Sequence, residues 1–386
     1  MILLTNISCL LLFNLYYLIF VCLSRVVVLH LFTRRSTNVT VENVHYLFLN
    51  CPLCFNSTEM VDIAQRCVGA VVGSLVADAA AMPVHWIYDV GKMKKVVEDC
   101  QQKPEFLPES RCPFYSLPTG RYSSYGDQTF VLLKSMVENK GLNTDHYKKS
   151  LYERFGPKSA YEIDLGHPRT KDDLPIPGPW RPASLTEFIK NYDEGLTKTG
   201  KATDAQADGF SKVAPLVALY AGNTAKLVQE VEKAIRVTQE DAIAVECGLA
   251  AASILEKCVL GKSIEVAVRE TLESSNTDVK AYIQKAIDGK TTPHTDFVHQ
   301  VGSSCKVPGN FTNSVHCLLN SNGEFRDTVV MTIVPGGCNC SRCGFVGATL
   351  GAVNGFKAIP EDWISKTSNG HDLVNFANQL VGLREG

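Results

Sequence analysis

The sequence predicts an all-α protein with one large domain that covers most of the chain. Apolar residues recur at helical spacing over much of its length, for example at Leu227, Val231 and Ile235. Few segments alternate apolar and polar residues as a strand does, and the two best, residues 39–49 and 328–334, do so weakly. No internal repeat of solenoid length is present, so a repeat architecture is not expected.

The helical segments can be placed in order along the chain. The first, residues 63–81, is rich in Ala, Val and Gly and ends before Pro83, because proline cannot continue a helix. The run Thr238-Gln239-Glu240-Asp241 has the form of a capping box that opens a long helix. Long loops are expected at 101–125 and 156–184, which are rich in Pro and Gly. The other predicted helices cover 130–137, 213–220, 225–237, 238–257, 266–272 and 279–287.

A glycine- and thiol-rich stretch, residues 335–352, follows a strand-like run at 329–334. A helix is expected to begin within the stretch, with Ser341 as its N-cap. Three glycines recur every four residues along this helix: Gly347, Gly351 and Gly355. They share a face without side chains, so another backbone can come close. The helix start suits an anion, because its N–H groups are free; the alternative is an ordinary loop before a packed core helix.

The composition is that of a globular protein with a hydrophobic core. Of the 386 residues, 45% are hydrophobic and 20% are charged. The formal net charge is -2, so no global basic field predicts a nucleic-acid partner. Fourteen cysteines would suggest disulfides in a small secreted chain, but this chain is long and its cysteines are irregularly spaced. Reduced thiols in a cytoplasmic body are therefore expected.

The N-terminal segment differs from the rest. Residues 2–24 carry no charge and are long enough to cross a hydrocarbon core. Basic residues follow this run and none precedes it, which places the body on the cytosolic side of a membrane anchor. The alternative is that residues 1–59 are not part of the mature protein, because Met60 resembles a second natural start. Both interpretations leave one domain at residues 60–386.

Three polar turns each lead into a helix rich in Gly or Ala, in the stretches 69–83, 120–129 and 336–352. A fourth stretch, residues 208–216, begins with Asp-Gly before an apolar run. In this order and spacing they resemble the ADP-ribosylglycohydrolase family over roughly residues 61–380. The branch of the J-type lens crystallins and selenoprotein J is the most similar, through His85-Trp86-Ile87-Tyr88-Asp89, Tyr125-Gly126-Asp127-Gln128 and Asn339-Cys340-Ser341-Arg342.

The resemblance implies an orthogonal helical bundle around a cleft that holds two Mg²⁺ or Mn²⁺ ions. Active members release ADP-ribose from modified proteins or small molecules, so the implied partner is an ADP-ribose-like molecule or an ADP-ribosylated substrate. The metals are implied to lie between a Thr/Ser-Asp-Asp-Thr turn and an Asp-x-Asp-Thr/Ser turn. Those residue types fit the role, because hard divalent ions prefer oxygen ligands.

This chain departs from the family pattern at both turns. The first reads Gly126-Asp127-Gln128-Thr129, in which Asp127 alone keeps a carboxylate. The second reads Cys338-Asn339-Cys340-Ser341, in which Ser341 matches and thiols replace both aspartates. The metal site carried over is thus Asp127, Cys338, Cys340 and Ser341. Losing three carboxylates should abolish ordinary Mg²⁺ binding, while thiols suit softer metals.

Each remaining carboxylate has two interpretations. Asp127 is a ligand or general acid/base, or it caps a helix that starts near Thr129. Asp78 lies in an apolar helix, where a carboxylate needs a partner, and it either faces the cleft or bonds to a turn. Asp208 either caps the helix that follows or touches a ligand. His85 could likewise stack on adenine or form a structural pair with its neighbour.

The thiols of the second turn are the most unusual group. Cys340 and Cys343 share a face at a helix start, where a thiol has a lowered pKa, so a redox or nucleophilic role of Cys338 and Cys340 is one hypothesis. Zinc binding is another and needs a fourth ligand, Cys305 or His316. Plain buried cysteines are the third.

Two functions follow. The first is an ADP-ribosylglycohydrolase-like protein that hydrolyses or binds an ADP-ribosyl ligand, with a degenerate divalent-metal site and Asp127 as the catalytic candidate. The second is a catalytically inactive structural protein, like the lens crystallins. The first predicts that the helix starts near Asp127 and Ser341 meet at one cavity. The ligand-binding residues expected there are Asp78, Gly126, Gln128, Thr129, Asp208, Gly209, Gly337 and Ser341.

Overall fold

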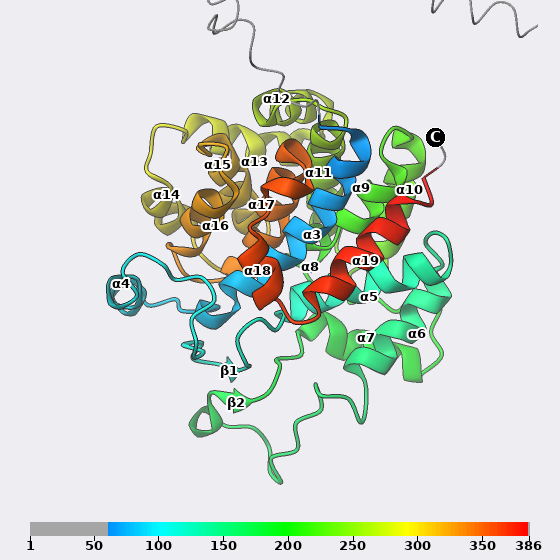
Figure 1. Ribbon diagram of the computed structural model, residues 1–386. Helices are drawn as coiled ribbons and strands as arrows, with labels where there is room; N and C mark the ends of the chain where they lie inside the picture. The colour runs from blue at the N-terminus through cyan, green and yellow to red at the C-terminus, as the bar shows by residue number, and fades with distance from the viewer. Residues whose placement is uncertain (1–60, 385–386) are drawn as a thin grey trace, which may run out of the picture. The chain divides into compact units, whose positions relative to one another are not determined.

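Two helices cross at the centre of the domain: α3 (Ile63–Ala81) and α17 (Asn339–Asn354). The computed structural model of the protein describes residues 61–384, and in it both helices are surrounded by others (Figure 1). Helices α5, α9 and α19 pack on α3, and α11, α15 and α16 pack on α17. Most residues of the two central helices are fully buried, so the core of the domain lies along this crossing.

Glycines let the two central helices touch backbone to backbone. Gly69 faces Gly351 and Gly73 faces Gly347, and a Cβ added at any of them would overlap a carbonyl oxygen of the facing helix. The predicted helix face without side chains is therefore confirmed for Gly347 and Gly351, whereas Gly355 follows the end of α17 with φ of +79°.

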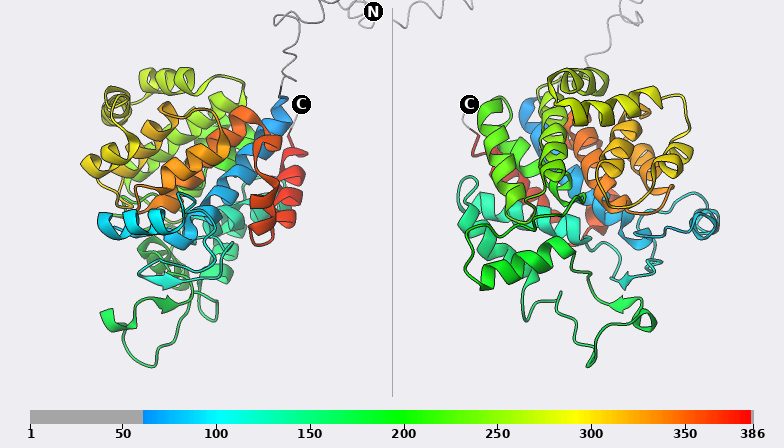
Figure 2. Two further views of the ribbon diagram at one scale, coloured as in Figure 1. Left: turned by 60° about the vertical axis from the view of Figure 1, so that its left-hand side comes forward. Right: turned by 180° about the vertical axis from the view of Figure 1, so that it is seen from behind.

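The remaining helices complete an all-α domain, as predicted. In the described residues the only strands are β1 (Tyr115–Ser116) and β2 (Ile176–Pro177), which pair in parallel. The long loops that carry them lie together at one end of the domain (Figure 2). The other helices are α4 (Val90–Asp99), α5 (Ser124–Glu138), α6 (Thr144–Phe155), α7 (Ala183–Asp193), α8 (Asp208–Ser211), α9 (Ala214–Tyr220), α10 (Thr224–Arg236), α11 (Ala242–Val259), α12 (Ile264–Ser274), α13 (Thr277–Asp288), α14 (His294–Val301), α15 (Gly309–Leu319), α16 (Phe325–Ile333), α18 (Glu361–Lys366) and α19 (Gly370–Val381), with 3-10 turns η1 (Met82–Val84), η2 (Lys171–Asp173) and η3 (Phe356–Ala358).

The strand-like interpretation of residues 328–334 is wrong, because this run belongs to α16. Its buried residues are spaced for a helix: Phe325, Thr328, Val329, Thr332 and Ile333. The short alternation of Thr and Val was compatible with either period, and packing against α17 selects the helix.

Two predicted caps are also wrong. Helix α17 begins at Asn339 with Cys338 as N-cap, so Ser341 lies inside its first turn. Helix α11 is capped by Asp241, whose carboxylate accepts hydrogen bonds from the N–H groups of Ile243 and Ala244. The Thr238 hydroxyl instead binds Lys212, so the capping box does not form.

Among the described residues, one segment is long and apolar enough to cross a membrane, Ile63–Val84. Its most apolar stretch of 18 residues is entirely buried inside the domain, and the segment consists of the core helix α3 and the turn η1. The hydrophobic run at residues 2–24 and the weak strand pattern at 39–49 lie outside the described residues. Membrane anchoring and the cytoplasmic placement of the body therefore stay predictions.

Candidate functional site

Asp78 joins the central helix α3 to the start of α5. Its carboxylate accepts hydrogen bonds from the backbone N–H and the hydroxyl of Ser123, the N-cap of α5, at 2.8 and 2.5 Å. Gly126 passes so close to Asp78 that an added Cβ would overlap the carboxylate. Burial raises the pKa of Asp78 to about 7, although the Ser123 hydrogen bonds act in the opposite direction. Of the two interpretations of Asp78, the bond to a turn is the one present.

Asp127 lies in the first turn of α5 and is not its cap, because the helix starts at Ser124. The Nη2 atom of Arg154 on α6 donates to both carboxylate oxygens, at 2.8 and 2.7 Å. The Tyr161 hydroxyl donates to the second oxygen at 2.6 Å. Both oxygens of this buried carboxylate are therefore engaged by the protein itself.

Gln128, which stands where the family has a carboxylate, bridges two buried charges. Its amide nitrogen donates to Asp208 at 2.7 Å, and its amide oxygen accepts from Lys212 at 3.1 Å. Ser184 donates to the same Asp208 oxygen at 3.0 Å, and Lys212 also donates to Thr238 at 2.8 Å. Burial lowers the pKa of Lys212 to about 8 and raises that of Asp208.

The second turn is also fully buried. The Ser341 hydroxyl donates to the Cys338 carbonyl at 3.1 Å and lies 3.2 Å from Asn310 Oδ1. The Cys338 sulfur lies 3.4 Å from the Tyr125 hydroxyl and 3.6 Å from His85 Nε2. The starts of α5 and α17 thus meet, as predicted, through the contact between Tyr125 and Cys338.

The glycines and the threonine of the predicted site are used by the fold. Gly337 has φ of +66° and exchanges backbone hydrogen bonds with the segment 86–87, at 2.8 Å each. A Cβ at Gly209 would press against the Ala244 carbonyl of α11. The Thr129 hydroxyl donates to the Tyr125 carbonyl at 3.0 Å.

The cysteines of the second turn differ in their surroundings. Burial raises the pKa of the Cys340 and Cys343 thiols well above the ordinary value, which favours plain buried cysteines there. Burial also opposes ionisation of Cys338, but hydrogen bonds with Cys305, His85 and Ser341 outweigh it and set the Cys338 pKa well below the ordinary value.

His85 and His316 are both occupied within the fold. His85 is fully buried, with its ring centroid 4.6 Å from that of Trp86 and its Nδ1 2.7 Å from the Tyr115 hydroxyl. The structural-pair interpretation of His85 and Trp86 is therefore favoured. His316 contacts His294 at 2.9 Å and the Gly289 carbonyl at 2.9 Å.

A cavity of about 700 Å³ opens beside Asp127. Three cations and three carboxylates line it: Arg121, Lys134, Arg154, Asp127, Glu138 and Glu153. Of the predicted site residues only Asp127 lines this cavity, and Ser341 is fully buried away from it. This cavity is therefore not the shared cavity predicted at both helix starts, because Ser341 does not line it.

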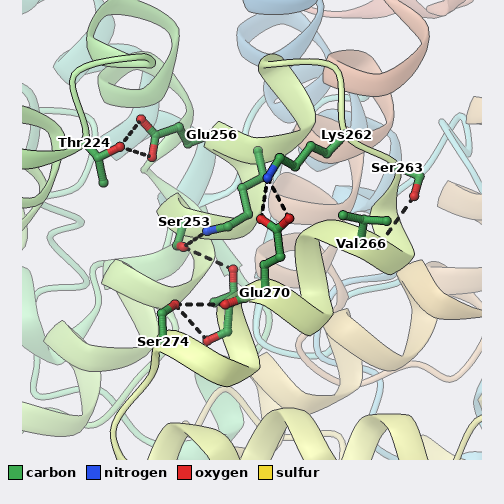
Figure 3. A network of polar contacts seen from close by, with 10 residues as sticks. Thr224, Ser253, Glu256, Lys262, Ser263, Val266, Glu270 and Ser274 are labelled. Atoms are coloured by element: carbon green, nitrogen blue, oxygen red, sulfur yellow. Dashed lines mark hydrogen bonds and ion pairs between the residues drawn. The ribbon is translucent and has the colours of Figure 1, made fainter.

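A second cavity of about 450 Å³ lies among α10 to α13 and contains none of the predicted site residues. Figure 3 shows the polar contacts around it. The buried Glu256 carboxylate accepts a hydrogen bond from the Thr224 hydroxyl, and Lys262 pairs with Glu270 nearer the surface. These two contacts tie neighbouring helices together.

Sequence analysis missed four residues that hold the candidate site: Arg154, Tyr161, Ser184 and Lys212. Each lies far along the chain from the carboxylate or amide it contacts, and of the four only Lys212 belongs to a recognised stretch, residues 208–216. Lys212 carried one usable signal. A lysine within an apolar run must be buried with a partner, because an isolated buried charge is too costly.

Residues 59–386 match the family model described as ADP-ribosylglycohydrolase. The chain belongs to this family. Crystallin J1A of Tripedalia cystophora is 39% identical over 317 residues, which cover 82% of this chain and 96% of that protein. Crystallin J1B of the same organism is 35% identical over 321 residues, with 83% and 97% covered. Both the family and the crystallin branch predicted from the motifs are confirmed.

A solved structure titled "ADP-ribosylglycohydrolase-related protein complex" has the same fold as this family member. The TM-score is 0.58, with 18% sequence identity and coverage of 84% of this chain and 99% of that chain. The predicted bundle of the ADP-ribosylglycohydrolase type is therefore confirmed.

The ADP-ribosylglycohydrolase family generally binds divalent metals, but the residues of this member do not fit Mg²⁺. Two positions offer sulfur, one offers an amide already used by Asp208 and Lys212, and the Asp127 carboxylate is neutralised by Arg154. Within residues 61–384, no group of three or more His, Cys, Asp and Glu could hold a metal ion. A hard cation needs several oxygen ligands, and this site does not supply them.

Proposed function

We propose that this protein is a non-hydrolysing member of the ADP-ribosylglycohydrolase family that binds an ADP-ribosyl-like anion at the cavity beside Asp127. The pairing of Asp127 with Arg154 carries the proposal, because it affects catalysis and binding in opposite ways. The other predicted ligand-binding residues do not line the cavity, and they support it by holding the starts of α5 and α17 in place.

The pairing weakens catalysis. Water attack on the ribose anomeric carbon needs a general base or a metal-bound water. Arg154 and Tyr161 occupy both oxygens of the Asp127 carboxylate with hydrogen bonds, so neither oxygen is free to take a proton from an attacking water. Asp127 remains the catalytic candidate if turnover is found.

The same pairing supports anion binding. Arg154 uses only Nη2 for Asp127, and its Nε and Nη1 atoms make no hydrogen bond with the described residues. Arg121 and Lys134 line the same cavity, and the rings of Tyr122 and Phe130 lie in its wall. Guanidinium donors suit a pyrophosphate and aromatic rings suit a planar base, while the volume is in the range of ligand sites.

Calorimetric titration of the full chain with ADP-ribose tests the binding. Arg154 also holds Asp127, so the informative comparison is between Asp127→Asn and the double variant Asp127→Asn/Arg154→Gln. We expect the double variant to bind about 10- to 100-fold more weakly, because hydrogen bonds to charged groups contribute about 1.5–3 kcal/mol. The matched control is Arg269→Gln, an exposed arginine outside the cavity, which should leave the affinity unchanged.

A turnover assay with a panel of ADP-ribose conjugates tests the absence of hydrolysis. Release of ADP-ribose that rises when Mg²⁺ is added would overturn that part of the proposal. The absence of binding heat with ADP-ribose would overturn the other part.

A second candidate function is that of a structural protein without a ligand. It is favoured by the names of the relatives, which are called crystallins, and by the internal hydrogen bonding of both former metal turns. It predicts a high thermal stability that does not change when ADP-ribose is added.

A further inference from the structure

A serine and a lysine on α11 share a hydrogen bond in the wall of the second cavity, the one of about 450 Å³ among α10 to α13. The Nζ atom of Lys257 lies 2.6 Å from the Oγ atom of Ser253, and both residues line the cavity (Figure 3). Their spacing of four residues places them on one face of the helix. Both side chains are half-buried, so the pair is enclosed by the cavity but can be reached from it.

Lys257 has a hydroxyl partner where other lysines of this region have a carboxylate. Lys226 of α10 pairs with Glu230 at 2.9 Å, and Lys262, between α11 and α12, pairs with Glu270 at 2.6 Å. Within residues 61–384, Lys257 forms no ion pair, and its side chain contacts Ser253 instead. An ion pair would hold the amine in its protonated form, and that restraint is missing here.

The surroundings of Lys257 favour a neutral amine. Burial lowers its pKa and Lys262 acts in the same direction, although Glu256 and Glu270 oppose the shift. A protonated Lys257 donates the hydrogen bond to Ser253, whereas a neutral Lys257 accepts it from the Ser253 hydroxyl. Only the neutral amine can take a proton, so the shift increases the fraction of the protein in which Lys257 is a base.

A second hydroxyl lies beside the pair. Thr271 of α12 is buried and lines the cavity, and its Oγ1 atom lies 3.1 Å from Ser253 Oγ. A hydroxyl fixed at this place is a hydrogen-bond donor for an oxygen that becomes negative when Ser253 attacks a carbonyl group.

The rest of the cavity wall selects the kind of molecule that fits. Its volume is in the range of small-molecule sites, and aliphatic side chains make up much of the wall. The carboxylates of Glu246 and Glu256 also line it, and they repel an anionic ligand. The aliphatic residues are Leu227, Val228, Leu249, Ala250, Ala252 and Val279.

We propose that Ser253 and Lys257 form a nucleophile and base that hydrolyse neutral esters with a short apolar acyl group. Ser253 Oγ attacks the ester carbonyl carbon while Lys257 Nζ takes the hydroxyl proton. The bond from that carbon to the alcohol oxygen breaks, and the alcohol leaves with the proton from Lys257. Water then attacks the acyl-serine and gives a proton to Lys257. The bond to Ser253 Oγ breaks, the carboxylic acid leaves, and Ser253 regains its proton from Lys257.

An alkyl fluorophosphonate tests the nucleophile, because an activated serine displaces its fluoride and keeps the phosphonyl group. The full-length protein is treated with the reagent, and its peptides are mapped by mass spectrometry. We expect the label on Ser253, and we expect Lys257→Met to slow labelling at least about 100-fold, as for loss of a general base. The matched controls are Ser365→Ala and Lys95→Met at exposed residues outside the cavity, which should leave the rate unchanged.

Turnover of two esters tests the substrate class. The wild type should hydrolyse neutral 4-nitrophenyl butyrate faster than anionic 4-nitrophenyl hemisuccinate, and Ser253→Ala should abolish both activities. Circular dichroism of each variant establishes that it is folded.

Three outcomes would overturn the proposal: no label on Ser253, an unchanged labelling rate in Lys257→Met, or full ester turnover in Ser253→Ala. These tests are separate from ADP-ribose binding, because neither residue lines the cavity beside Asp127. Both Ser253→Ala and Lys257→Met should therefore bind ADP-ribose as the wild type does.

Discussion

One nitrogen of the Arg154 guanidinium, Nη2, donates hydrogen bonds to both carboxylate oxygens of Asp127, at 2.8 and 2.7 Å. In this family the corresponding turn is expected to present carboxylates to metal ions. Here an internal cation from α6 takes that place at Asp127, and an amide replaces the neighbouring carboxylate at Gln128. In this protein Asp127 therefore forms an ion pair at the wall of a cavity.

Substitution Asp127→Asn should destabilise the fold by about 1–3 kcal/mol, because it leaves the partly buried Arg154 without its ionic partner. Urea denaturation measures this change. Glu265→Gln is the matched control, since it removes an exposed carboxylate paired with Arg269 and Lys290 and should cost less than about 1 kcal/mol. Equal losses in the two variants would contradict a special role for the Asp127 pair. Any turnover detected in the wild type should disappear in Asp127→Asn.

Gly351→Ala should destabilise the domain by at least about 3 kcal/mol or prevent folding, because the new methyl group would overlap the Gly69 carbonyl. Gly344→Ala provides a control in the same helix. The nearest atom to its added Cβ is 3.7 Å away, so only a small change of either sign is expected, within about 1 kcal/mol. The melting temperature of Gly351→Ala should lie clearly below that of Gly344→Ala. Similar melting temperatures would refute the close backbone contact between α3 and α17.

The stability of Asp78→Asn relative to the wild type should increase as the pH rises. The pKa of Asp78 in the folded state is about 7, above the value of about 3.9 in an unfolded chain. Between these values the folded state binds a proton that the unfolded state does not, so the wild type loses stability as the pH rises. The slope is about 1.4 kcal/mol per pH unit at most, and the neutral amide removes it. From pH 4 to 8 the denaturation midpoint of the wild type should fall relative to that of the variant. Parallel plots of the two midpoints against pH would contradict a buried protonated carboxyl at Asp78.

For His294 we expect the opposite dependence of stability on pH. Burial lowers its pKa well below the ordinary value, and the neighbouring Arg342 and His316 act in the same direction. Below about pH 6.5, His294 binds a proton in the unfolded chain but not in the folded state. Stability therefore falls as the pH falls through that value. In His294→Gln the number of protons taken up on unfolding in acid should be smaller by about one, which makes the loss of stability less steep. His371→Gln, at an exposed histidine, should not change it. Unchanged acid sensitivity of His294→Gln would contradict this role.

Millimolar Mg²⁺ should leave the melting temperature of the wild type unchanged, because a ligand stabilises a fold only if it binds the folded state. The triple variant Gln128→Asp/Cys338→Asp/Cys340→Asp restores the carboxylates of the family turns. If it folds, we expect Mg²⁺ to raise its melting temperature. A rise in the wild type would show that the former metal site still works.

The sequence was most informative where short-range rules apply. The bounds predicted for the helix 63–81 agree with α3, since proline ends it and Asp62 caps it. The spacing of Gly347 and Gly351 correctly predicted a close backbone contact, although nothing in the sequence identified α3 as the partner. The strand-like prediction at 328–334 failed because seven residues are too few to separate the helical period from the strand period.

The candidate site was only half predictable. Motifs located Asp78, Asp127 and Asp208, but the side chains that satisfy them belong to other elements. The partners of Asp127 lie 27 and 34 residues away, and those of Asp208 lie 80 and 24 residues away. Spacing rules describe neighbours on one element, so contacts of this kind depend on how the helices pack.

The crossing of α3 with α17 also has a consequence for biosynthesis. The ribosome makes α3 before its glycine-lined partner α17, which follows only after all the helices from α4 to α16. Until then the nascent polypeptide exposes an apolar helix that is as hydrophobic as a membrane span. The helices between them leave the face that packs on α17 uncovered, so chaperones that bind hydrophobic segments should associate with incomplete chains that stop short of Asn339.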